Sequence, residues 1–211
     1  MSIIASLTKK IEETAIVSPT LRFFCKLYYN PIVKREIELA NITKKDHVLC
    51  IGGGPFPWTA IEIARDTRAK VTVIDVHYLS TLYAKQAISI FGLENLIEIR
   101  LGDGQSIDTS DFTVTHIALQ AMPQDRILSN VLNRSKQGSR VLVRCAHDCL
   151  GSFYSCLSNQ CLCDMCKSTR QKNSTMSETL LFIKGLRGER FEEANAYASR
   201  VNINSTASVA K

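Results

Sequence analysis

The sequence predicts an α/β fold in which a mostly parallel β-sheet carries helices on both faces. Two observations predict it. A short apolar run, residues 48–51, ends in Gly52, Gly53 and Gly54 and leads into an apolar, helix-compatible stretch at 58–64, as a first strand leads into a helix in nucleotide-binding folds. Further apolar runs then alternate with helical patterns, which is typical of parallel sheets. The remaining strands are expected at 71–75, 97–101, 112–119, 139–145 and 179–184, and the core helices at 59–67, 79–91 and 124–135.

The glycine-rich turn is the centre of the predicted binding site. Glycine is needed there because a Cβ would block the tight turn and hold the backbone away from a ligand. The free N–H groups at the start of the following helix can then face a polar or anionic group. Pro55 stiffens the turn, and we place it with the three glycines among the cofactor-binding residues.

An acidic residue ends the second predicted strand. Asp75 lies 21 positions after Gly54 and is followed by Val76, close to the ~20-residue spacing of a carboxylate that grips ribose hydroxyls. The alternative is a strand-end aspartate that caps the next helix and needs no ligand. Together with the glycine turn, the spacing predicts a nucleoside-containing ligand.

The third predicted strand ends in Gly102, Asp103 and Gly104. This pattern resembles the Rossmann-like class I S-adenosylmethionine (SAM) methyltransferase fold, where an acid after the third strand faces the adenine amino group. The position of the last glycine of a dinucleotide motif is occupied here by Trp58 or Pro57, and either is bulky, which disfavours a pyrophosphate. Gln120 and Ala121 follow the fourth strand and complete the predicted cofactor-binding residues.

Length and pattern together predict one SAM-binding domain with small appendages. The expected divisions are a short N-terminal helical cap at 1–46, the SAM-binding domain at 47–187 with a cysteine-rich insertion at 149–166, and a C-terminal helix with a flexible tail at 188–211. Helical spacing in the cap indicates helices at 3–17, 21–28 and 32–40, with a turn at Asn30–Pro31.

Composition argues against several partner classes. The net charge of +6 is mild and scattered, so we expect no nucleic-acid partner. No apolar run approaches the ~18 residues of a membrane helix, and the first residues lack the features of a signal peptide. A cytoplasmic protein acting on a small molecule is therefore expected, and a homodimer is left open.

Three segments in the same order resemble the nicotianamine synthase family. Residues 27–30, Leu-Tyr-Tyr-Asn, are followed by Glu36 and Glu38, as the family's Tyr-Tyr-Asn is followed by a glutamate. Residues 52–59, Gly-Gly-Gly-Pro-Phe-Pro-Trp-Thr, are close to the family's Gly-x-Gly-Pro-Leu-Pro-Leu-Thr. Residues 141–147 resemble the family's strand ending in Arg-Ser-Ala-His.

The resemblance implies a particular use of SAM. The family transfers the 3-amino-3-carboxypropyl group of SAM to an amine, releases methylthioadenosine and makes metal-chelating small molecules (metallophore biosynthesis). An amine nucleophile must lose a proton, so a nearby carboxylate or phenol is needed. The candidates are Tyr28, Tyr29, Glu36, Glu38 and His147. The acceptor would be a small-molecule amine or amino acid.

The chain also departs from the family. Its region before the Tyr-Tyr pair is short, and Glu12 and Glu13 are the acids left in it. Two other functions therefore stay open: a SAM-dependent small-molecule methyltransferase, and a SAM- or metal-binding module without catalysis.

The segment after residue 148 is rich in cysteine. Cys156, Cys161, Cys163 and Cys166 lie within eleven residues, and the last two have the spacing of a metal knuckle. Four thiolates would suit a structural zinc ion and leave no open coordination position. The alternatives are an iron–sulfur cluster, free thiols and disulfides.

Overall fold

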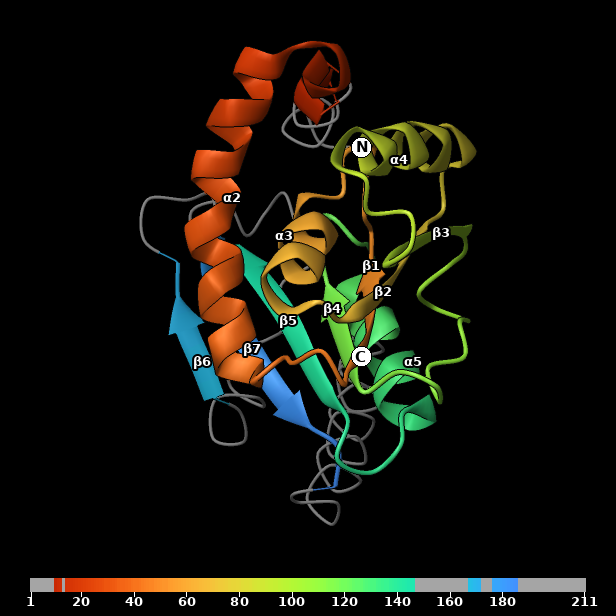
Figure 1. The fold of residues 1–211 in the computed structure, drawn as a ribbon. Coiled ribbons are helices and arrows are strands. Elements are labelled where there is room, and N and C mark those ends of the chain that lie inside the picture. The colour runs from red at the N-terminus through yellow and green to blue at the C-terminus, as the bar shows by residue number, and fades with distance from the viewer. Residues whose placement is uncertain (1–9, 13, 147–166, 172–175, 186–211) are drawn as a thin grey trace, which may run out of the picture.

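A computed structural model describes residues 10–12, 14–146, 167–171 and 176–185, and it contains a seven-stranded sheet in the order β3-β2-β1-β4-β5-β7-β6 (Figure 1). The strands are β1 His47–Ile51, β2 Lys70–Asp75, β3 Ile97–Leu101, β4 Val114–Ile117, β5 Arg140–Ala146, β6 Lys167–Arg170 and β7 Met176–Ile183. The helices with described bounds are α2 Pro19–Ala40, α3 Trp58–Thr67, α4 Tyr78–Phe91 and α5 Gln124–Arg134. The predicted α/β fold is confirmed, and the strand and helix bounds differ from the expected ones by a few residues.

Strands β1 to β5 pair in parallel, whereas β7 runs antiparallel to both of its neighbours, β5 and β6. The chain leaves β1 toward β2 and β3 on one side and returns to β4 on the other side. The order of strands therefore reverses between β1 and β4. In open α/β sheets, ligands bind in the crevice at the carboxyl ends of the strands beside such a reversal.

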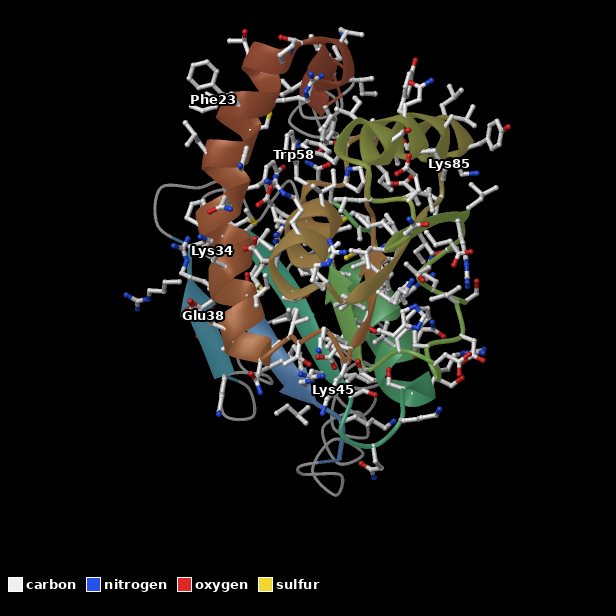
Figure 2. All side chains as sticks on the ribbon, viewed as in Figure 1. Phe23, Lys34, Glu38, Lys45, Trp58 and Lys85 are labelled. Atoms are coloured by element: carbon white, nitrogen blue, oxygen red, sulfur yellow. The ribbon has the colours of Figure 1, made fainter. Side chains whose placement is uncertain are left out.

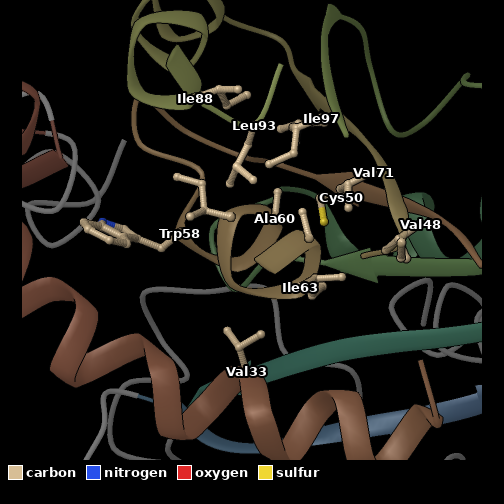
Figure 3. Packing of buried hydrophobic residues seen from close by; sticks show 14 of the residues in the cluster. Val33, Val48, Cys50, Trp58, Ala60, Ile63, Val71, Ile88, Leu93 and Ile97 are labelled. Atoms are coloured by element: carbon tan, nitrogen blue, oxygen red, sulfur yellow. The ribbon is translucent and has the colours of Figure 1, made fainter. Parts of the chain in front are cut away.

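The sheet separates two apolar cores. On one face α2, α3 and α4 pack against residues such as Val48 and Val71, and on the other face α5 packs against Leu49 and Val141. Figure 3 shows Val33 of α2 pointing toward α3, while the sheet residues lie on the far side of α3. The alternation of inward and outward side chains along each strand thus fixes both layers of helices.

The helical cap differs from the expectation in one respect. Residues 19–40 form one continuous helix, α2, that includes Pro31, where the sequence predicted a turn between two helices. The predicted break at Ser18-Pro19 is present, because Ser18 is the N-cap and accepts a hydrogen bond from the N–H of Leu21. An interior proline costs a helix about 3 kcal/mol, so tertiary contacts must offset that cost.

Those contacts tie α2 to the sheet and to α3. Beside the proline, Asn30 donates a 2.8 Å hydrogen bond to Glu62 of α3, and Ile32 and Val33 are fully buried. At the end of α2, Arg140 of β5 donates to the carbonyl of Ala40 at 2.7 Å. The helix runs over the β5–β7–β6 side of the sheet (Figure 1).

Strand β6 was not predicted. Its sequence, Lys-Ser-Thr-Arg, has no apolar alternation, and its side chains are largely exposed. The strand forms because its backbone pairs with β7 from Lys167 to Arg170 at the edge of the sheet. A polar, lysine-bearing edge strand of this kind resists pairing with other chains.

Several expectations lie outside the described residues. These are His147, the cysteine-rich insertion at 149–166, the helix expected at 188–201 and the tail at 202–211. Among the helices of the described part, none combines the length and apolarity that a bilayer crossing requires.

Candidate active site

A cavity of about 360 Å³ lies between the N-terminal half of α2 and the glycine turn after β1. Its wall also includes residues at the carboxyl ends of β4 and β5. The volume is within the range of small-molecule sites, roughly 300–1,000 Å³. The predicted site residues that line it are Tyr28, Tyr29, Gly52, Gly53 and Gln120.

The glycine turn has the backbone that its sequence predicts. Gly54 adopts a φ of +66°, a conformation that side chains rarely allow. A Cβ on Gly54 would lie 2.5 Å from Oε2 of Glu12, and a Cβ on Gly53 would overlap Val73 of β2. Glycine is therefore required both for the turn and for the close approach of Glu12. Pro55 is buried behind the turn.

Asp75 holds the glycine turn from the end of β2. Its Oδ2 accepts a 2.9 Å hydrogen bond from the N–H of Gly54, and its Oδ1 accepts one of 2.9 Å from the N–H of His77. The second bond does not cap α4 as the alternative interpretation predicted, because His77 is the N-cap of that helix and no side chain caps it. A carboxylate has further lone pairs, so these two bonds leave acceptor sites for a ligand hydroxyl. The next residue, Val76, is 58% exposed.

The other predicted cofactor residues are not among the residues that line the cavity. Asp103 is exposed after β3, and its Oδ1 accepts from the N–H of Gln105 at 2.8 Å. Gly102 is half-buried. Gly104 is a packing residue, because its Cβ would lie 2.6 Å from Ile51. Ala121 is buried against Gly52.

An aromatic stack forms one side of the cavity. The ring of Trp58 lies 4.2 Å from that of Phe56 and 6.3 Å from that of Tyr29, with nearly parallel planes in both pairs. Tyr28 contacts Tyr29 edge to face at 5.0 Å. Both tyrosines line the cavity although they are neighbours in the chain. The indole N–H of Trp58 is buried and has no hydrogen-bond acceptor among the described residues.

Tyr29 is held in its protonated form. Burial raises the pKa of the Tyr29 phenol well above its ordinary value, and the negative charge of Glu12 raises it further. The positive charge of Arg144 opposes this only in part. At neutral pH Tyr29 is therefore a hydrogen-bond donor, and a carboxylate is the better proton acceptor in this cavity.

Glu36 lies beneath the cavity in a buried ion pair. Its carboxylate accepts from Nε and Nη2 of Arg144, both at 2.7 Å. Burial by itself would raise the pKa of Glu36, but the positive charge of Arg144, followed by the electrostatic interaction with His116, holds it well below its ordinary value. Glu36 is fully buried and is not among the described residues that line the cavity. Its hydrogen bonds make it a positioning residue for Arg144.

His116 of β4 lies beside this pair. Its Nε2 is 3.3 Å from Oε2 of Glu36 but is not oriented for a hydrogen bond. Burial, followed by the charge of Arg144, lowers the pKa of His116 below 6.5. The imidazole is therefore neutral at pH 7, and it lines the cavity.

Glu38 and the predicted metal site are placed differently. Glu38 is exposed on the outer side of α2 (Figure 2), away from the cavity wall. Within the described residues, no group of three or more His, Cys, Asp or Glu side chains could hold a metal ion. The four cysteines predicted as zinc ligands fall in the undescribed insertion, so the zinc site stays a prediction.

The sequence pointed only weakly to several cavity residues. Glu12 had been noted only as a remaining acid of the short N-terminus, yet it lines the cavity next to Gly54. Arg144 and His116 lie within apolar strands, and a charged or polar residue in such a run signals a buried partner. Trp58 stands out in the sequence for its bulk and within the motif at residues 52–59, and neither signal predicts its place in the aromatic stack.

The chain resembles several known proteins. No family model matches it. It is 25% identical over 130 residues to L-histidine 2-aminobutanoyltransferase of Yersinia pestis, a match that covers 61% of this chain and 48% of the relative. The chain thus spans about half the length of that relative.

Among solved structures, a mutant of the nicotianamine synthase MtNAS in complex with SAM has a TM-score of 0.69 at 19% identity, covering 85% of this chain and 74% of that one. An RNA methyltransferase of Salinibacter ruber with S-adenosylhomocysteine has a TM-score of 0.57 at 19% identity, covering 73% and 90%. The chain has the class I SAM methyltransferase fold. The predicted resemblance to nicotianamine synthases is confirmed at the level of the fold.

Proposed function

We propose that the protein transfers the 3-amino-3-carboxypropyl group of SAM to an amine of a small molecule and releases methylthioadenosine. In this reaction the amine nitrogen forms a bond to the Cγ of SAM while the bond from Cγ to sulfur breaks. The sulfonium becomes the neutral thioether of methylthioadenosine. The amine loses one proton, which a base in the cavity must accept.

The arrangement of Glu12 and Tyr29 beside the glycine turn carries this proposal. Glu12 lies against Gly54, and its negative charge raises the pKa of Tyr29. We assign Glu12 as the acceptor of the amine proton and protonated Tyr29 as the hydrogen-bond donor that orients the nucleophile. Glu12 is one of the two acidic residues in the short N-terminal region, and in this proposal it is the catalytic carboxylate.

The residues present suit SAM as the other substrate. The glycine turn brings backbone close to the cavity, and Asp75 at the end of β2 has lone pairs left for ribose hydroxyls. We assign Asp103, which is exposed after β3, to the adenine amino group. The likeness to MtNAS with bound SAM supports this assignment.

The acceptor we propose is an amino acid or a related amine. The relative from Yersinia pestis is named for transfer to L-histidine. An amino acid extended by an aminocarboxypropyl group carries several amine and carboxylate donors, which would make the product a metal chelator. The cavity volume of about 360 Å³ suits a ligand of this size.

Methyl transfer to a small molecule is the second candidate, and the similarity of the fold to that of a methyltransferase favours it. Incubation of the protein with SAM and a panel of amino acids, followed by mass spectrometry of the nucleoside, separates the possibilities. Methylthioadenosine supports the proposed reaction, and S-adenosylhomocysteine would replace it by methyl transfer. Binding of SAM without either product would indicate a module that binds SAM without catalysis.

A further inference from the structure

The guanidinium of Arg144 uses only one edge within the protein. Nε and Nη2 donate to the two oxygens of Glu36. The residue is 4% exposed and lines the cavity. No residue in the described part of the chain accepts a hydrogen bond from Nη1. An arginine carries more donors than one carboxylate can accept, and they lie in a fixed planar fork.

Arg144 cannot turn this edge elsewhere, because Glu36 is itself fixed. Oε1 of Glu36 also accepts from Oγ1 of Thr179 on β7 at 2.8 Å. Thr179 in turn accepts from Gln171 at 3.0 Å, and Gln171 accepts from Arg35 of α2 at 2.8 and 3.0 Å. This chain of bonds joins α2 to β7 and holds the guanidinium in one orientation.

In the described part of the chain, the fully buried side-chain polar atoms without a partner belong to Trp58 and His116, so the remaining edge of Arg144 is accessible from the cavity, where a ligand acceptor can bind it. A carboxylate matches it best, since two coplanar oxygens fit two N–H groups of the fork. Glu36 already balances the charge of Arg144, which allows the pair to stay buried when no ligand is bound. Glu12, Tyr29 and Arg144 all line the cavity, and the charges of Glu12 and Arg144 both shift the pKa of Tyr29. The wall of the cavity therefore carries both a cation and a carboxylate.

We propose that Arg144 is the carboxylate-binding residue of this cavity, that Glu36 positions it, and that the ligand is an α-amino acid group whose amine faces Glu12. The orientation of the amine rests on the proposed transfer reaction. Two sources share this chemistry, namely the methionyl part of SAM and an amino-acid acceptor. Both predict that removal of one carboxylate from the ligand weakens binding.

The unique tryptophan, Trp58, provides the measurement. Since it lines the cavity, its fluorescence should report a bound ligand without any turnover. The wild-type protein is titrated with SAM and its decarboxylated form, and then, in the presence of methylthioadenosine, with L-histidine and L-histidinamide. We expect the carboxylate form of at least one pair to bind about 10- to 100-fold more tightly, as for a charged hydrogen-bonded pair. The pair that shows the difference identifies the source.

Variants then connect the preference to the residue. Arg144→Lys and Glu36→Gln should reduce the ratio of affinities within that pair toward one. Lysine lacks the planar fork of N–H donors, and glutamine at position 36 no longer holds the guanidinium of Arg144 in its orientation. Arg100→Lys is the matched control: Arg100 donates to the two oxygens of Glu98 at 2.8 and 2.7 Å, as Arg144 does to Glu36, but it is exposed and does not line the cavity, so the ratio should stay as in the wild type.

Equal affinities within both wild-type pairs would overturn the proposal even if no variant folds. An unchanged ratio in folded Arg144→Lys would overturn it as well. The proposed transfer reaction is tested separately and would be refuted if no methylthioadenosine were released. The affinity ratios could still be measured in that case.

Discussion

The backbone N–H of Gly54 donates to Oδ2 of Asp75 at 2.9 Å, which ties the glycine turn to the end of the second strand. The carboxylate that sequence spacing assigns to a ribose therefore also shapes the turn. In Asp75→Asn one oxygen becomes an NH₂ donor that cannot accept from the N–H of Gly54 or His77. We expect methylthioadenosine binding to weaken by about ten- to a hundredfold, measured by calorimetry.

A nucleoside that lacks the ribose hydroxyls shows how much of this loss of affinity comes from the disturbed turn and how much from lost contacts with the ligand. If Asp75 contacts those hydroxyls, the variant should lose much less affinity for that analogue than for methylthioadenosine. Equal losses for both would assign Asp75 to the turn alone. Asp66→Asn, an exposed change on α3, serves as the control.

Gly54→Ala should disturb both the turn and Glu12. Gly54 and Gly92 have nearly equal φ values, +66° and +63°, but only Gly54 has Glu12 against it; a Cβ on Gly92 meets nothing within 4 Å. We expect Gly92→Ala to cost about 1 kcal/mol of unfolding free energy from backbone strain alone. Gly54→Ala should cost more and should also reduce transfer activity. Equal unfolding midpoints in urea and equal activities for the two variants would contradict the close approach of Glu12.

Glu12→Gln should reduce the rate of transfer, because glutamine cannot accept the amine proton. Removal of a general base lowers rates by about 10²- to 10⁴-fold. Tyr29→Phe should have a smaller effect and should leave the pH–rate profile unchanged near neutrality, since the raised pKa keeps the phenol protonated there. Release of methylthioadenosine is the measurement, and Tyr83→Phe on α4 is the control. A phenylalanine variant as slow as Glu12→Gln would instead make Tyr29 essential to proton transfer.

The ion pair of Glu36 and Arg144 should make stability depend on acid. Because the pKa of Glu36 in the fold lies below its ordinary 4.5, the unfolded chain takes up this proton first as the pH falls. The contribution is therefore complete above about pH 4.5 and is lost progressively below it. The free energy of unfolding, measured in urea between about pH 3 and 7, should show this decline in addition to the declines caused by other carboxylates. The decline should be smaller in Glu36→Gln.

At neutral pH Glu36→Gln should itself cost about 3–5 kcal/mol, because it leaves Arg144 charged and buried. Glu38→Gln on the same helix is exposed and should follow the wild type. Thr179→Val, which removes one bond to Glu36, should cost about 1 kcal/mol and provides a milder test if the glutamine variant does not fold. A Glu36→Gln protein as stable as Glu38→Gln would refute the account of the pair.

The parts predicted well from sequence depend on neighbours in the chain. The strand after His47, the turn at Gly54 and the acid at Asp75 belong to one βαβ unit, whose alternation and spacing are local signals. Tyr28 and Tyr29 came from a motif and do line the cavity.

The parts missed depend on contacts between distant residues. Helix α2 continues through Pro31 because Asn30 bonds to Glu62, 32 residues away. The resemblance to the nicotianamine synthases makes Glu36 a catalytic candidate, and its bond to Arg144, 108 residues away, could not be predicted from the chain. Strand β6 exists only through its pairing with β7. Tertiary contacts override local preference at each of these places.

The bond between Glu36 and Thr179 spans 143 residues, and it bears on the order in which the protein matures on the ribosome. Helix α2 is synthesised early, but its buried carboxylate has no complete set of partners until β7 has emerged. At roughly 5–20 residues per second, this delay lasts on the order of ten seconds. We expect nascent chains that end before residue 176 to expose α2 to protease, and chains that extend well beyond β7 to protect it.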